Sequence, residues 1–157
     1  MTLPTPAPHD IPSSGDAVPG LRASPVRVAV VQFDPQVGVE NLARNAAAVR
    51  QQLEAAVAGG AQLIVLPELA TTGYCFNGRE EAFAHAEPVP HGPTVQGWVA
   101  FAAKHGVYLV GCLAEQDGMQ LLDTAVLVGP EGYIGRYRKT HLGNHEKLWL
   151  RPGNGGH

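Results

Sequence analysis

The sequence predicts an α/β protein with a mixed, mostly buried sheet and helices on one face. Two apolar runs, residues 26–33 and 62–66, enclose a segment at 39–58 with helical periodicity. A strand, a helix and a strand within 41 residues form a βαβ unit, so the two strands should be parallel. Residues 121–129 and 133–142 flank a Pro-Glu-Gly turn and predict an antiparallel hairpin.

The first three elements are predicted from their side-chain patterns. The β-branched run at 26–33 has little polar interruption, which is typical of a strand covered on both faces. In the segment 39–58 one apolar stripe recurs every three or four residues, as in an amphipathic helix. Its members are Leu42, Ala46, Val49, Leu53 and Ala56. Gly59 and Gly60 should end this helix, because glycine tolerates a positive φ.

The middle of the chain predicts a second helix and a further strand. A loop, with room for a short helix, leads from the strand at 62–66 to Pro93, which suits the first turn of a helix. Apolar residues then share one face until Gly106, where the helix should end. The run at 107–114 predicts another buried strand.

Composition limits the chain to one domain with a modest core, since it has 157 residues. Six of the 13 prolines fall within residues 1–25, among few large apolar side chains. Such a segment buries too little surface to offset its ordering entropy, so we expect a disordered tail. The folded domain should then occupy residues 26–157.

Charge and composition also limit the classes of partner that the chain is expected to bind. A net charge of -3 gives no reason to expect nucleic acid or an anionic membrane as a partner. No apolar run approaches the roughly 20 residues that a membrane helix needs, and the first 20 residues do not resemble a signal peptide. Two cysteines provide no disulfide framework. We therefore expect a cytoplasmic location.

Glu68 is the first candidate for chemistry. It stands just past the carboxyl end of the strand that finishes at Leu66, and functional groups gather at this edge of an α/β sheet. A carboxylate partly shielded from water by Leu69 and Tyr74 could act as a general base. The alternative is a loop glutamate that caps a helix or forms a salt bridge.

Lys139 is the second candidate, within the basic stretch "GRYRKTHL". In a strand, Arg136 and Arg138 would point to one side while Tyr137 and Lys139 point to the other. Lys139 therefore need not belong to a solvated row of arginines. An inward lysine could stabilise a developing oxyanion. The alternative is an ordinary basic edge strand that discourages pairing with other chains.

Other residues give weaker signals. His141 and His145 are four residues apart without a third ligand, and "HEKLW" lacks the second histidine of a zinc-protease motif. We therefore predict no metal site. Cys75 and Cys112 are interpreted as small buried apolar residues. Cys112 in particular has no base near it in the sequence.

Three stretches in this order, "VRVAVVQFDPQVGVENLARN", "LIVLPELATTGY" and "GRYRKTHL", resemble the nitrilase superfamily of carbon–nitrogen hydrolases. The resemblance runs from about Val26 to the end of the chain. It implies a four-layer α-β-β-α sandwich, of which about half is present, and a Glu-Lys-Cys mechanism. Glu68 would take the proton of the thiol, Lys139 would hold the tetrahedral intermediate, and Glu146 would position the substrate and the lysine.

The resemblance also implies a class of substrate. Members act on small amides, N-carbamoyl compounds or nitriles, without a metal or an organic cofactor. A full-length member would be expected to form homo-oligomers. The chain departs from the family pattern at Asp123, where asparagine is usual, at Gly143, where an aromatic is common, and at Asn154, where aspartate is expected.

The family's cysteine lies beyond a segment like "LWLRPGNGGH", which is where this sequence stops. We therefore expect an N-terminal portion that carries the base and the lysine, with the nucleophile missing and one sheet face bare. A second reading is a non-catalytic remnant or small-molecule-binding module of the same fold. A third is an unrelated α/β binding domain in which Glu68 and Lys139 are structural.

Overall fold

The structure, a computed structural model, describes residues 24–74, 76–143 and 145–154. Residues 1–23 of the tail predicted at 1–25 therefore lie outside the described residues. Cys75 lies outside them as well. The elements are β1 (Val28–Val30), η1 (Val39–Asn41), α1 (Leu42–Ala58), β2 (Leu63–Val65), α2 (Arg79–His85), α3 (Pro93–His105), β3 (Tyr108–Asp117), β4 (Gln120–Gly129), β5 (Gly132–Arg138) and η2 (Glu146–Leu148).

The described strands form one mixed sheet in the order β1-β2-β3-β4-β5. β1, β2 and β3 are parallel, whereas β4 and β5 are antiparallel to their neighbours. The predicted α/β class, the βαβ unit and the hairpin are thus confirmed. β3 continues three residues beyond the predicted end at Ala114, and β5 ends at Arg138, so Lys139 follows the strand.

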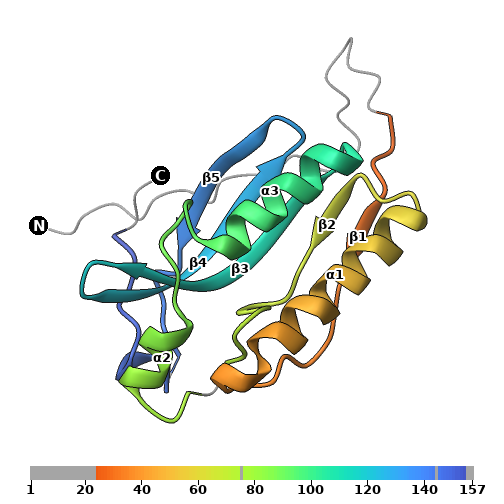
Figure 1. The fold of residues 1–157 in the computed structure, drawn as a ribbon. Helices are drawn as coiled ribbons and strands as arrows, with labels where there is room; N and C mark the ends of the chain where they lie inside the picture. Colours follow the sequence, from red (N-terminus) through yellow and green to blue (C-terminus); the bar gives the residue numbers. More distant parts are fainter. Residues whose placement is uncertain (1–23, 75, 144, 155–157) are drawn as a thin grey trace, which may run out of the picture.

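Helices α1 and α3 lie side by side against one face of the sheet (Figure 1). The core between the layers includes fully buried Ile64 and Leu109 from the sheet and the α3 residue Trp98, which is 4% exposed. Gly111 of β3 faces this tryptophan. A Cβ at Gly111 would stand 2.3 Å from the indole ring, so only glycine lets α3 approach the sheet this closely.

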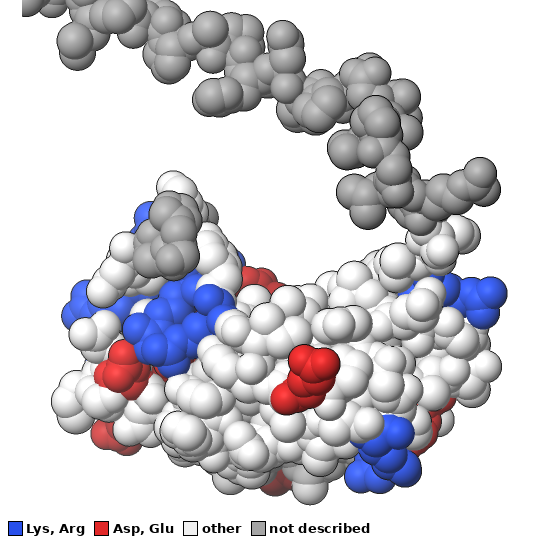
Figure 2. Space-filling view, turned by 90° about the horizontal axis from the view of Figure 1, so that it is seen from above, with Lys and Arg blue, Asp and Glu red and all other residues white. Residues whose placement is uncertain are grey.

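The other face of the sheet is open at β1 and at the start of β3, whereas a second cluster that includes Leu69, Phe76 and Leu150 covers Ala114 and Leu121 on the same side. The sequence predicts cover on both faces for residues 26–33, but Val28 and Val30 of β1 are 50% and 78% exposed, and Tyr108 of β3 is 48% exposed. Side chains alternate along a strand, so these residues point away from α1 and α3, and no element of the described residues covers them. Figure 2, seen from above the view of Figure 1, shows a cluster of Lys and Arg side chains at the left, further Lys and Arg side chains at the right, and mostly uncharged surface between them.

An irregularity in the β4–β5 ladder sets the register of the second half of β5. Val128 pairs with Tyr133, but Leu127 pairs with Gly135, so Ile134 is an extra residue without a partner opposite. Such a bulge shifts all later pairs by one position. Lys139 consequently comes to lie opposite Asp123, whose carbonyl oxygen accepts the Lys139 backbone N–H at 2.9 Å.

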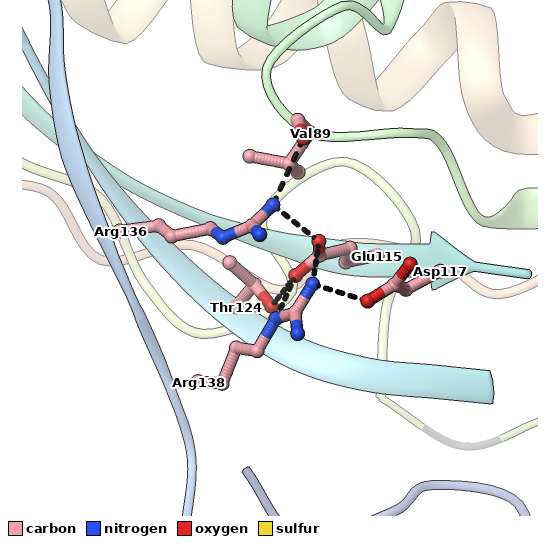
Figure 3. A network of polar contacts seen from close by, with 6 residues as sticks. All are labelled: Val89, Glu115, Asp117, Thr124, Arg136 and Arg138. Atoms are coloured by element: carbon pink, nitrogen blue, oxygen red, sulfur yellow. Dashed lines mark hydrogen bonds and ion pairs between the residues drawn. The ribbon is translucent and has the colours of Figure 1, made fainter. Parts of the chain in front are cut away.

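On the helix-covered side of β5, two arginines hold a buried glutamate (Figure 3). Glu115 is 1% exposed and accepts hydrogen bonds from Arg136 at 2.7 Å and Arg138 at 2.6 Å. The Thr124 hydroxyl adds a bond of 2.6 Å, and Asp117 binds the outer side of Arg138 at 2.7 Å. The expected solvated row of arginines is therefore found only in part: β3 carries an acidic partner on the same face, and the side chains of Arg136 and Arg138 are 35% and 21% exposed.

The Glu115 network should contribute strongly to stability. Glu115→Gln leaves two guanidinium groups without their carboxylate, so we expect the free energy of unfolding to fall by about 3 kcal/mol. The measurement is urea unfolding of dilute chain followed by tryptophan fluorescence. Asp117→Asn is the matched control and should cost less than about 1 kcal/mol, since Asp117 is 56% exposed. Equal losses in the two variants would contradict the assignment.

The open face should drive self-association of the isolated chain, because exposed apolar patches above a few hundred Å² act as interaction sites. We expect sedimentation to show species heavier than the monomer. Val30→Lys places a charge on this face and should shift the distribution towards monomer. Gln51→Lys adds the same charge to the exposed surface of α1 and should not. A monodisperse wild-type monomer would rule out this role of the face.

Candidate active site

A constrained turn after β2 positions Glu68. Leu69, the next residue, is buried and has a φ of 46°, a conformation that non-glycine side chains rarely adopt. Its carbonyl oxygen accepts the N–H of Gly73 at 2.9 Å. The N–H of Ala70 donates to the backbone carbonyl oxygen of Cys112 in β3 at 3.0 Å. Backbone bonds therefore tie the turn both to itself and to the sheet.

Lys139 forms hydrogen bonds to both of the other residues predicted for the site, Glu68 and Glu146. Its ammonium nitrogen donates to Glu68 Oε1 at 2.6 Å and to Glu146 Oε1 at 2.6 Å. Its backbone is fixed on both sides, since its N–H is bonded to Asp123 and its carbonyl oxygen accepts the N–H of Gly153 at 2.8 Å. The sequence predicted these three side chains from separate segments, and the structure brings them together.

Glu146 is held from several directions at the start of η2. It is 2% exposed, and its carboxylate accepts hydrogen bonds from the Tyr74 hydroxyl and the Gly143 N–H as well as from Lys139. Burial alone would raise the pKa of Glu146, but these bonds outweigh it and lower the pKa. The hydrogen bond to Glu146 in turn raises the pKa of Tyr74 to about 12. The carboxylate is therefore ionised and fixed.

The two carboxylates keep Lys139 charged. Burial by itself would lower the pKa of Lys139, but the hydrogen bonds to Glu146 and Glu68 raise it above its ordinary value. The site thus contains a permanent cation at a defined position. Such a group can stabilise negative charge that develops on a neighbouring oxygen.

Glu68 is less shielded from water than the sequence suggests. Its side chain is 43% exposed, and Tyr74, expected to shield it, is itself 40% exposed. The reason is that Glu68 meets Lys139 at the open face of the sheet. The expected dry surroundings of the base are not formed by the residues that the structure describes.

Sequence reasoning missed two members of the cluster, Asp123 and Cys112. The Cys112 thiol donates to Asp123 Oδ1 at 2.8 Å, and Asp123 Oδ2 lies 3.7 Å from the Lys139 ammonium nitrogen. A two-residue turn at Gly118 and Met119 sets a register that pairs Cys112 with Ala125, so Asp123 is its diagonal neighbour on the same face. Recognising this turn in the sequence would have revealed the contact.

The environments of these two residues shift both pKa values upward. Burial and the nearby Asp123 carboxylate raise the pKa of the Cys112 thiol, so the thiol stays protonated and is not an activated nucleophile. Burial, with the neighbouring carboxyl group of Glu68, raises the pKa of Asp123 to about 7.

The carboxylates already surround a cation. Oxygens of Glu68, Asp123 and Glu146 lie within 4.8 Å of one another, and the ammonium of Lys139 stands among them. The lysine therefore supplies the positive charge at this cluster.

No helix in the described part of the chain is long and apolar enough to cross a membrane.

A family model for carbon-nitrogen hydrolases matches residues 27–157. The chain belongs to the carbon-nitrogen hydrolase family. It is 44% identical over 129 residues to a nitrilase of Pyrococcus abyssi, covering 82% of this chain and 48% of that protein. It is 28% identical over 143 residues to a protein N-terminal amidase of Saccharomyces cerevisiae, covering 85% of this chain and 31% of the yeast protein.

A solved structure of N-terminal amidase shares the fold of this carbon-nitrogen hydrolase chain. The TM-score is 0.73 at 26% identity, covering 82% of this chain and 31% of that one. The chain thus spans from about a third to about half the length of these proteins. The nitrilase-type fold predicted from the sequence is confirmed, while the roles of Glu68, Lys139 and Glu146 stay predictions.

The Lys139 cluster should make stability depend on pH. The folded-state pKa of Glu146 is depressed, so its contribution is present above the ordinary value of 4.5 and is lost as the pH falls through the folded value. We expect Lys139→Met to lower the free energy of unfolding by about 1–2 kcal/mol at neutral pH, and by less at about pH 3.5. Urea unfolding at both pH values measures this.

The matched control for this variant is Lys104→Met on the exposed surface of α3. It should change stability little at either pH. A Lys139→Met penalty that is the same at both pH values would contradict an electrostatic role for the lysine.

Proposed function

We propose that this chain supplies the general base and the lysine of a carbon–nitrogen hydrolase acting on small amides, N-carbamoyl compounds or nitriles. The supporting observation is the position of the Lys139 ammonium nitrogen, 2.6 Å from both Glu68 and Glu146. A base and a fixed cation side by side are the two groups that acyl transfer to a thiol needs, besides the thiol itself. The similarity to a nitrilase and an amidase supports the substrate class.

In the proposed reaction Glu68 takes the proton from a cysteine thiol as the sulfur attacks the substrate carbon. The electron pair of the amide C=O bond moves to the oxygen, and Lys139 stabilises the resulting negative charge. The C–N bond then breaks, and the leaving amine takes the proton from Glu68. Water attacks the thioester with Glu68 again as base, which releases the acid and regenerates the thiol.

The thiol in this scheme comes from outside the described residues. Cys112 lies near the cluster, but its raised pKa keeps it protonated and bonded to Asp123. We infer that a cysteine in the part of the fold that the relatives have and this chain does not span completes the site. Glu146 holds Lys139 in place through the 2.6 Å hydrogen bond to its ammonium nitrogen, and it would position the substrate as well.

A non-catalytic module that binds the same small molecules is the second candidate, because the described cluster contains a binding cation without an activated nucleophile. A cytoplasmic location, the absence of a nucleic-acid partner and homo-oligomer formation by a full-length protein stay predictions.

A chimera tests the hydrolase proposal. Residues 26–157 are joined to the remaining C-terminal part of the Pyrococcus abyssi nitrilase, which matches this chain at 44% identity. We expect the chimera to release ammonia from amide, carbamoyl or nitrile substrates. The 157-residue chain alone should release none. Glu68→Gln and Lys139→Met should each lower kcat/KM of the chimera by about 100-fold or more.

Two variants serve as controls for the chimera. Glu80→Gln changes an exposed glutamate of α2 in the same chemical way, and Cys112→Ala removes the thiol that the scheme does not use. Neither should lower ammonia release by a comparable factor. Binding of substrate without turnover would favour the binding module. Turnover by the isolated chain that Glu68→Gln abolishes would mean that another thiol serves.

A further inference from the structure

Asp123 is the member of the cluster that has a buried carboxylate oxygen without a hydrogen bond. It is 2% exposed, and its Oδ1 accepts the Cys112 thiol, but its buried Oδ2 has no hydrogen-bond partner among the residues that the structure describes. The Lys139 ammonium nitrogen is 3.7 Å away and is already bonded to Glu68 and Glu146. A buried carboxylate oxygen without a donor is costly, so this atom needs either a donor or a proton of its own.

The charges around Asp123 favour a proton. It faces Glu68 from the loop after β2, Cys112 from β3, Lys139 after β5 and, through the lysine, Glu146 of η2. Three carboxylates around one ammonium would carry a net charge of -2 if all were ionised. One proton on Oδ2 reduces this charge and creates a donor that can bond to the neighbouring carboxylate of Glu68.

We propose that Asp123 is a positioning residue that shares one proton with Glu68, holding the base in place while the proton is present and releasing it when the proton is lost. The shared proton rests on the contacts above, whereas its use in positioning a base rests on the proposed function. The pKa of Asp123, raised to about 7 by burial and by the facing Glu68, agrees with a proton that is held up to near neutral pH.

The two protonation states have different consequences for the base. With the proton present, Oδ2–H donates to Glu68, and the carboxylate of Glu68 is fixed between Asp123 and Lys139. After ionisation, two negative groups face each other, and Glu68, which is already 43% exposed, is repelled towards water. An asparagine at position 123 would copy the neutral acid, with an N–H donor for Glu68 and an oxygen acceptor for Cys112, but could not titrate.

The test is a carboxyl ¹³C NMR titration of the chain from about pH 4 to pH 9, in the Val30→Lys background. The Asp123 signal, identified by its absence in Asp123→Asn, should have its midpoint near pH 7. The Glu68 signal should shift in the same pH range, and this second shift should disappear in Asp123→Asn. If Asp123→Asn does not fold, correlation to the backbone resonances of Asp123 identifies the signal.

Glu68→Gln tests whether the proton is shared. Loss of the facing charge should lower the Asp123 midpoint by about one pH unit, a tenfold change in proton affinity. Glu131→Gln is the matched control in the β4–β5 turn, at the other end of the strand pair, and should leave the midpoint unchanged. A midpoint below about pH 5, or one near pH 7 that Glu68→Gln does not move, overturns the proposal.

This titration does not require turnover. If the chimera is inactive while the Asp123 midpoint depends on Glu68, the hydrolase proposal fails and the shared proton stands. If the chimera is active and Asp123 is ionised at pH 5, the shared proton is disproved and the hydrolase proposal is unaffected.

Discussion

The pairing of Lys139 with Asp123 across β4 and β5 depends on the extra residue Ile134. The β4–β5 turn by itself would place Arg138 opposite Asp123, since Val128 pairs with Tyr133. After the bulge, Thr124 pairs with Arg138, so the next residue, Lys139, lies opposite Asp123. A guanidinium is a planar fork, whereas an ammonium is a compact charge that fits among three carboxylates. The bulge therefore decides which type of cation enters the cluster.

The two faces of the sheet differ in the ratio of cationic to acidic side chains. On the helix-covered face, Arg136 and Arg138 surround the single carboxylate of Glu115, and Asp117 restores neutrality at the rim. On the open face one ammonium serves several carboxylates. On the helix-covered face the buried carboxylate of Glu115 is satisfied, because two guanidinium groups bond it. An excess of acids around a lysine keeps that lysine charged and leaves a carboxylate free for proton transfer.

Much of the fold could be predicted from the sequence because local patterns determine it. The 3.6-residue stripe at 39–58 and the β-branched runs on either side reflect burial against neighbours that lie nearby in the chain. Alternation along β5 correctly separated Lys139 from Arg136 and Arg138. The partner of the arginines could not be predicted, because Glu115 belongs to a different strand and looks like an ordinary surface glutamate in the sequence.

The candidate site was predictable only in part, for a related reason. Glu68 and Lys139 stand at strand ends, where position alone suggests a function. Asp123 and Cys112 lie inside strands, and their meeting depends on a hairpin register that the composition of β3 and β4 does not specify. The exposure of Glu68 was likewise unpredictable, because it reflects what covers the face and not the residues beside Glu68 in the chain.

The separation of the two faces has a practical consequence for protein engineering. Side chains that pack under α1 and α3 maintain the scaffold, and those on the opposite side carry the reactive groups. Libraries that randomise exposed outward-pointing positions of β3 and β4 would explore new specificities, whereas Ala114 and Leu121, which are fully buried on that side, belong to the scaffold's packing. Any such library should preserve the bulge at Ile134, since a regular ladder with the same sequence would place Arg138 opposite Asp123.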